Sequence, residues 1–212
     1  IQVSDQLKAE FPSYLNSLKL EDEKGNALTL DAQGNGSFKD YVKNVIVRAA
    51  DKARKSGVTF EDKPWVKLNK EGVSDIDWEG YIHSEKRMKS PPAFDALNLS
   101  SGENNLFGTE SVNNQHFTDY STQHSSEKGK MADKHVIQLM NAMNYVDHGK
   151  TAYWRIRAGT SDRDTSHAIS AILAIKLRMA GKQVDYETPW GVPHSGDYDL
   201  DELFQWMDSI SK

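Results

Sequence analysis

The C-terminal segment of the chain carries the pattern that most restricts its fold, because two strand-like runs alternate there with two helical runs. Residues 153–157 and 184–186 contain the β-branched and aromatic side chains that favour strands. Residues 165–179 and 200–210 repeat apolar side chains at helical spacing. The order strand, loop, helix, strand, loop, helix is typical of parallel βα units, whose functional residues lie in loops at the carboxyl ends of strands. We therefore predict an α/β fold.

The composition excludes several classes of function. The 212 residues carry a net charge of −5 and show no basic stripe, so neither nucleic acid nor an anionic membrane is an expected partner. No apolar run reaches the roughly 20 residues that a membrane span needs. Cysteine is absent, which excludes disulfides and thiolate catalysis but leaves the compartment, cytoplasmic or secreted, open. The histidines are spaced too irregularly for a zinc site, so we expect no metal.

The N-terminal part of the chain has a different organisation. Residues 1–20 predict two short helices, interrupted at Pro12, and residues 19–31 predict a hairpin. Residues 37–56 predict a single amphipathic helix. Residues 58–130 lack long apolar runs but contain scattered aromatic side chains, which favours an insertion lying over another surface rather than disorder.

Two loops that follow the predicted strands hold residues of catalytic type. Asp162 ends the run Gly-Thr-Ser-Asp after the first strand, and His194 lies in the loop after the second. We expect a hydrogen bond between the two side chains, since carboxyl ends of neighbouring parallel strands meet at one edge. Such a carboxylate fixes the tautomer of the imidazole and stabilises its positive charge, so that the ring can act as a base. The alternative is that Asp162 caps the next helix and His194 is an ordinary loop residue.

The order of these residues is that of the end of an α/β-hydrolase, in which nucleophile, acid and histidine follow one another along the chain. The nucleophilic serine should lie on a G-x-S-x-G elbow, but no such elbow is present. Glycine is missing from at least one of the two required offsets at Ser56, Ser74, Ser101, Ser161 and Ser195. We therefore expect the serine in sequence that precedes Ile1. The 212-residue chain alone should then be inactive as an esterase.

Three stretches resemble a known family. They are W-R-I-R-A-G-T-S-D-R-D-T-S-H-A-I (154–169), P-W-G-V-P-H-S-G-D-Y-D-L-D-E-L-F-Q-W (189–206) and K-R-M-K-S-P-P-A-F-D-A-L-N-L-S-S-G-E-N-N-L-F-G (86–108). Together they resemble bacterial tannases, the tannin acyl hydrolases of the subtype B and feruloyl-esterase-like group. The resemblance covers residues 80–210 well and the first 60 loosely. It implies that Asp162 is the acid and His194 the base of a Ser-His-Asp triad.

The resemblance also implies a set of residues that recognises gallate. It places this set on Lys89, Glu103 and Asp164, although Lys86 competes with Lys89 for the lysine position. Carboxylates accept hydrogen bonds from phenolic hydroxyls and an ammonium donates to their oxygens, so the set suits a galloyl ring. The alternatives are surface charge for Lys89 and Glu103, and a helix N-cap before Thr165 for Asp164.

From these observations we expect residues 1–14 and 131–212 to form part of an α/β-hydrolase core, with 131–147 helical, and residues 15–130 to form a lid-like insertion. The function expected is hydrolysis of gallate-type esters through an acyl-enzyme, with no cofactor. The partners are a small aromatic ester and the N-terminal portion of the same enzyme, which carries the serine. Two alternatives stay open: a feruloyl-type or general carboxylesterase, and a non-catalytic hydrolase-like binding module.

Overall fold

The computed structural model describes residues 2–86, 89–111 and 113–211. Its elements follow one another as α1 (Gln2–Ser17), β1 (Leu20–Glu21), β2 (Ala27–Leu28), α2 (Ser37–Lys55), β3 (Val66–Leu68), β4 (Val73–Ile76), α3 (Trp78–Glu85), α4 (Gly102–Leu106), α5 (Asp119–Gln123), α6 (Lys134–Met140), the 3-10 helix η1 (Ala142–Tyr145), β5 (Tyr153–Arg157), α7 (His167–Met179), β6 (Gln183–Glu187) and α8 (Leu200–Ile210). None of the described helices combines the length and apolarity that a membrane crossing requires.

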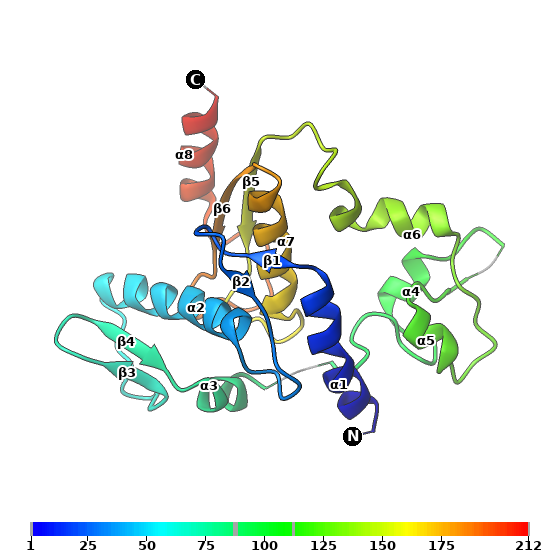
Figure 1. Cartoon of the computed structure of the whole chain (residues 1–212), viewed down its shortest axis with the longest axis horizontal. Coiled ribbons are helices and arrows are strands. Elements are labelled where there is room, and N and C mark those ends of the chain that lie inside the picture. Colours follow the sequence, from blue (N-terminus) through cyan, green and yellow to red (C-terminus); the bar gives the residue numbers. More distant parts are fainter. Residues whose placement is uncertain (1, 87–88, 112, 212) are drawn as a thin grey trace.

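The C-terminal segment forms the parallel unit that its sequence predicts. β5 and β6 pair in parallel, with Tyr153 opposite Gln183 and Arg157 opposite Glu187. Figure 1 shows the two strands side by side, with α7 packed beside them and α8 beyond the loop that follows β6. Both predicted strands and the last helix are therefore confirmed. The apolar side chains of α8, including Phe204, are largely exposed.

The paired strands have two chemically different faces, as alternation along a strand requires. Ile156 and Tyr186 belong to the apolar core beneath α7. On the opposite face Arg155 bonds to Asp185 at 3.3 Å and to Asp199 at 2.7 Å, so the start of α8 is tied to β5. The arginines of the Y-W-R-I-R run therefore position α8 by ion pairs on one side, while the apolar residues between them fill the core.

One hydrophobic core joins the N-terminal elements to α7. It combines residues of α1, both N-terminal hairpins, α2 and α3 with residues of α7 and β6. Its most buried members are Leu15, Leu20, Ile46, Ala50, Ile76, Ala171, Ala174 and Ile175. The hairpin over 19–31 and the helix over 37–56 are both confirmed. This core runs across the division that we expect between 15–130 and the rest of the chain. The domain boundaries themselves stay a prediction.

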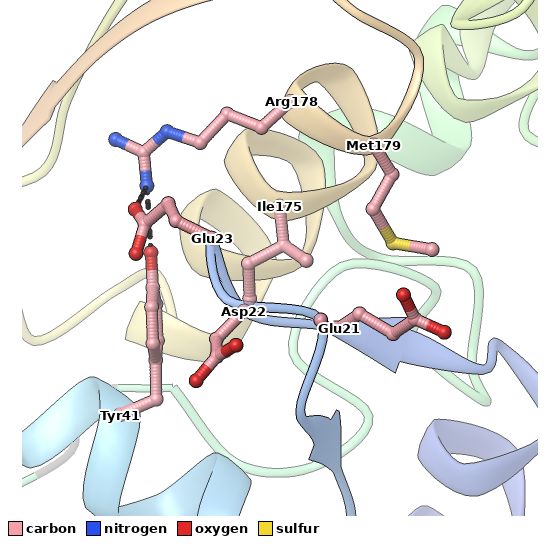
Figure 2. Close-up of a pocket in the computed structure, with 8 residues that line it drawn as sticks. Glu21, Asp22, Glu23, Tyr41, Ile175, Arg178 and Met179 are labelled. Carbon is pink, nitrogen blue, oxygen red and sulfur yellow. Dashed lines mark hydrogen bonds and ion pairs between the residues drawn. The ribbon is translucent and has the colours of Figure 1, made fainter.

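Polar contacts at the edge of this core fix α7 against the first hairpin. Figure 2 shows Arg178 of α7 reaching between the hairpin turn and α2. Its guanidinium lies 2.9 Å from Glu23 Oε1 and donates to the Tyr41 hydroxyl at 2.8 Å. The chain is thereby held together by directional bonds where the apolar contacts end.

A separate polar cluster organises the segment that carries α4 and α5. The carboxylate of Asp95, almost fully buried, accepts hydrogen bonds from the His116 ring at 2.6 Å and the Asn104 amide at 2.7 Å through Oδ1. Its Oδ2 accepts from the backbone of Phe117 and from both donors of Thr118. Because a buried carboxylate must be saturated with donors, this hub holds Asn104 of α4 and residues 116–118 before α5 against Asp95; Figure 1 shows α4 and α5 close together.

Two expectations for helices are wrong in detail. Residues 2–17 form one continuous helix with Pro12 inside it. Pro12 and Leu15 are both buried, and this packing offsets the missing backbone hydrogen bond. Residues 131–147 do not form one helix, because Asn141 ends α6 and its side chain accepts a hydrogen bond from Met143 N, which starts η1 instead.

The helix expected from Thr165 begins two residues later. Ser166 is its N-cap, and the Ser166 hydroxyl accepts a hydrogen bond from Ala168 N. The alternative role of Asp164 as the helix N-cap is therefore wrong, because Asp164 precedes the first helical residue, His167, by three positions. The β3–β4 hairpin, which packs against α2, was not predicted from the sequence of residues 58–130. Its strands have only three and four residues, which is too short for an alternating pattern to be recognised.

Candidate active site

The loops after β5 and β6 are bonded to each other rather than merely adjacent. Thr160 N donates to Pro189 O at 2.9 Å, and Gly191 N donates to Thr160 Oγ1 at 2.7 Å. A third bond runs from Ser161 N to Val192 O at 3.0 Å. These bonds make the two loops one unit, so a residue on either loop has a defined position relative to the other.

Gly159 permits this close approach. A Cβ at residue 159 would lie 2.0 Å from Val192 O and 2.7 Å from its carbonyl carbon, well inside van der Waals contact. Only glycine therefore allows the second loop to lie directly against the end of β5. The glycine of the G-T-S-D run serves packing between the loops and has no need of an unusual backbone angle.

The paired loops bring Asp162 and His194 together. Asp162 Oδ2 lies 3.0 Å from His194 Nδ1, which confirms the expected contact. Asp162 Oδ1 accepts from Asp164 N at 2.9 Å and Thr165 N at 3.0 Å, so both carboxylate oxygens are fixed. The Asp162 side chain is 8% exposed, whereas that of His194 is 62% exposed. A buried carboxylate thus orients a ring that faces outward; its catalytic role stays a prediction.

The electrostatics of Asp162 suit that arrangement. Burial raises the pKa of its carboxyl, but the hydrogen bonds from Thr165 N, the His194 ring and Asp164 N outweigh burial and hold the pKa below its ordinary value. Asp162 is therefore a carboxylate at neutral pH. Because a carboxylate only accepts, Nδ1 of His194 must carry the proton, and Nε2 is left as the acceptor that a general base needs.

Lys89 and Glu103, the first two residues of the expected gallate set, lie close to each other. Lys89 Nζ is 3.7 Å from Glu103 Oε1, and both side chains are partly exposed. The ammonium also lies 4.9 Å from the centre of the Phe94 ring. This ion pair brings together two residues that are 14 positions apart in the segment over 86–108. Residues 87–88 of this segment lie outside the described residues.

The same segment touches the loop of the proposed acid. Arg163 Nε donates to the backbone oxygen of Lys86 at 2.9 Å. Asp164 is partly buried beside Asp162. Within the part of the chain that the structure describes, no hydrogen bond or ion pair joins Lys89 or Glu103 to Asp164 or His194. Convergence of the set on one cavity therefore stays a prediction.

A cavity of about 500 Å³ lies behind the loop after β6. Its walls come from one face of α2, the start of α8 and the residues Pro189, Trp190 and Val192. Asp162 and His194 are outside this lining. Among the residues described, no group of three or more histidine, aspartate or glutamate side chains could hold a metal ion.

A second Asp-His-Ser chain is present in the polar hub. His116 Nδ1 lies 2.6 Å from Asp95, and its Nε2 lies 2.8 Å from Ser125 Oγ. His116 is fully buried, and Ser125 Oγ also lies 2.8 Å from Glu127 O. A base that no substrate can reach, bonded to a carboxylate saturated by other donors, serves structure. In residues 2–86, 89–111 and 113–211, no serine is hydrogen-bonded to His194.

Sequence reasoning overlooked a contact between Thr160 of the Asp162 loop and two side chains that lie beneath this loop, those of Tyr81 and His167. The Tyr81 hydroxyl donates to Thr160 O and lies 2.9 Å from His167 Nε2. His167 stands in the quoted run 154–169, but Tyr81 belongs to a distant segment without a recognisable motif. A lone tyrosine at helical spacing reads as ordinary core, so the sequence carries no signal for this contact.

No protein-family model matches the chain, and no curated protein sequence matches it. Solved structures do match. The tannase from Lactobacillus plantarum is 41% identical with a TM-score of 0.95, and the match covers 100% of this chain and 46% of that one. The tannase of Fusobacterium nucleatum is 48% identical with a TM-score of 0.95, over 100% and 46% respectively.

A further matching structure is a complex with a ligand. A tannin acyl hydrolase in complex with ethyl gallate is 42% identical, with a TM-score of 0.95, over 100% of this chain and 47% of that one. The chain therefore spans about half the length of each of these proteins. Identity at this level over every residue of the chain reflects common descent and not only a shared fold.

Proposed function

Since this chain belongs to the bacterial tannase family, of whose members it spans about half the length, we propose that it supplies the acid and the base of a gallate-ester hydrolase. Asp162 is the acid and His194 the base of a Ser-His-Asp triad. The serine and the oxyanion hole come from a part of the protein outside these 212 residues. The chain is then a portion of an α/β-hydrolase core that carries a lid-like insertion.

The observation that carries this proposal is the 3.0 Å contact between Asp162 Oδ2 and His194 Nδ1. With Nδ1 protonated and bonded to the carboxylate, Nε2 is free to accept the proton of an attacking serine hydroxyl. The imidazolium that forms is stabilised by the buried carboxylate, and it then donates the proton to the leaving alcohol. The acyl-enzyme is hydrolysed by the same steps with water in place of serine.

The proposed acyl group is a hydroxylated aromatic acid. Solved relatives are described in complex with ethyl gallate and with 3,4-dihydroxybenzoate. In this chain Glu103 and Asp164 would accept hydrogen bonds from ring hydroxyls, and Lys89 would donate to their oxygens. A site built around such pairs discriminates against rings without hydroxyls, because its polar groups would then be left unpaired.

The experiment compares ethyl gallate with ethyl benzoate, using the complete protein that contains this chain. His194→Gln should abolish hydrolysis of both esters, because the base is lost. Glu103→Gln and Asp164→Asn should each lower kcat/KM for ethyl gallate about ten- to a hundred-fold, the value of a charged hydrogen bond, and should barely change it for ethyl benzoate. Glu127→Gln, an exposed carboxylate of the same insertion, is the matched control and should change neither value.

Each alternative predicts another outcome. A general carboxylesterase would hydrolyse both esters at similar rates, and no variant would discriminate between them. A non-catalytic binding module would hydrolyse neither ester, even as the complete protein. Equal loss of both activities in Glu103→Gln would contradict the gallate site while leaving the triad in place.

A further inference from the structure

Tyr81 lies beneath the loop that carries the proposed acid, in a place where a phenol has little access to solvent. It belongs to α3 and is 3% exposed. Its ring packs against Trp65 with centroids 5.3 Å apart and against Trp78 at 5.9 Å. These contacts hold the ring in place, and a phenylalanine would make them equally well. Packing therefore does not account for the hydroxyl. Since burying a hydroxyl is unfavourable unless it forms hydrogen bonds, its role must lie in the bonds that it makes.

The Tyr81 hydroxyl has one proton to donate and two neighbours, Thr160 O and His167 Nε2. Burial raises the pKa of Tyr81, with the negative charges of Glu85 and Asp162 acting the same way, so the phenol stays protonated. Burial lowers the pKa of His167, so that ring is neutral near pH 7. The carbonyl of Thr160 can only accept, so Tyr81 donates its proton there. His167 Nε2, 2.9 Å away, must then carry a proton and donate it to the Tyr81 oxygen.

Thr160 transmits this constraint to both loops. Its backbone oxygen accepts from Tyr81, its backbone N–H donates to Pro189 O, and its hydroxyl oxygen accepts from Gly191 N. Thr160 is 2% exposed, so none of these bonds can be replaced readily by solvent. A shift of Thr160 would therefore move the acid loop and the histidine loop relative to each other.

We infer that Tyr81 is a positioning residue for the Asp162–His194 pair, acting through Thr160, with His167 as the donor that fixes its hydroxyl. This inference rests on the proposed function. It assigns a role to α3, an element remote in sequence from both loops. Tyr81 touches neither Asp162 nor His194 by a hydrogen bond; it fixes the backbone on which both depend.

The test is Tyr81→Phe in the complete protein, with Tyr186→Phe as the matched control. Tyr186 is also a buried tyrosine, but among the described residues its hydroxyl is hydrogen-bonded to the Ser170 hydroxyl, at 3.3 Å, and to neither loop. Tyr81→Phe should lower kcat for ethyl gallate about tenfold, the effect of one hydrogen bond, and leave KM within about twofold. The acid limb of the kcat/KM profile should also move to lower pH, because a loosened carboxylate stabilises the imidazolium less well.

A second measurement does not depend on activity. Backbone amide hydrogen exchange should rise in residues 159–162 and 189–194 of Tyr81→Phe, and should not change there in Tyr186→Phe. Should Tyr81→Phe not fold, His167→Leu removes the donor to the Tyr81 hydroxyl and is expected to raise exchange in the same two segments.

The outcomes separate this inference from the proposed function. If the complete native protein hydrolyses no ester, the proposed function fails, and raised exchange in both loops still supports the role of Tyr81. If the protein is active and Tyr81→Phe matches Tyr186→Phe in rate, pH profile and exchange, the inference is overturned. A loss of kcat with the pH profile and loop exchange unchanged overturns it as well, since that pattern reflects a general loss of folded enzyme.

Discussion

Replacement of Gly159 by alanine tests whether the close approach of the two loops positions the proposed acid–base pair, Asp162 and His194. An added Cβ would meet Val192 O at 2.0 Å, whereas ordinary contact begins at 3.4 Å. Val192 O also accepts the hydrogen bond from Ser161 N, so moving it away stretches a bond between the loops. The second loop must therefore shift by at least about 1 Å, and His194 is two residues from the displaced carbonyl.

The magnitudes follow from that displacement. Overpacking of a well-packed site costs about 1–3 kcal/mol of stability. Misplacement of a catalytic group by about 1 Å costs about 100-fold in rate. We expect Gly159→Ala in the complete protein to lower both the apparent Tm and kcat for ethyl gallate, with KM changed much less. The assay is steady-state hydrolysis together with thermal unfolding followed by circular dichroism.

Gly196→Ala is the matched control, because Gly196 lies in the same loop and a Cβ there would meet nothing within 4 Å. This variant should change the free energy of unfolding by no more than about 0.5 kcal/mol. If Gly159→Ala retains the kcat and Tm of Gly196→Ala, the loops adapt to each other freely. The argument that glycine sets their spacing is then refuted.

Two further predictions concern stability. Burial raises the pKa of Asp95, but the hydrogen bonds from His116, Thr118, Phe117 and Asn104 outweigh it and hold the pKa below its ordinary value. The stability contributed by this carboxylate is therefore fully present above the pKa of an unfolded aspartate, about 3.9, and is lost as the pH falls below that value. Urea unfolding at neutral and acidic pH should show this loss. Asp95→Asn should diminish the pH dependence and destabilise the protein at pH 7. Arg155→Ala should cost about 1.5–3 kcal/mol, the value of a charged hydrogen bond, because a 7% exposed side chain is lost and Asp185 and Asp199 keep only their pairing with Arg157. Lys52→Ala, whose side chain is 57% exposed, should cost less than about 1 kcal/mol, and equal effects in urea titrations would contradict this ranking.

The sequence predicted the C-terminal unit well because its signals are local. Tyr153–Arg157 is a short strand that contains aromatic and β-branched side chains, and Asp162 and His194 are placed in the loops after the two strands once both strands are recognised. Their contact needs only the parallel pairing of β5 and β6. The backbone bonds that also fix the two loops depend on Gly159, whose close contact with Val192 could not be foreseen from a single sequence.

The N-terminal half was predicted less well because tertiary contacts override local preference there. Pro12 predicts a break, but burial maintains the helix through it. The segment around Asp95 is built on side-chain hydrogen bonds, which leave no periodic pattern in the sequence. Tyr81 shows the same limit at the candidate site, since its partners Thr160 and His167 are about eighty residues away along the chain.

The Asp95 hub has a consequence for how such sequences can diverge. Each of its donors is buried or fixed by the same carboxylate, so one substitution leaves several groups without partners at once. A change at His116 or Asn104 is tolerable only if Asp95 changes as well, and the reverse also holds. These positions therefore form an epistatic unit, which can drift only by coordinated replacement. Glu103 is next to Asn104 on α4, but its carboxylate pairs with Lys89 rather than with the hub. Under the proposed function, substrate preference can therefore change at Glu103 while the hub is retained.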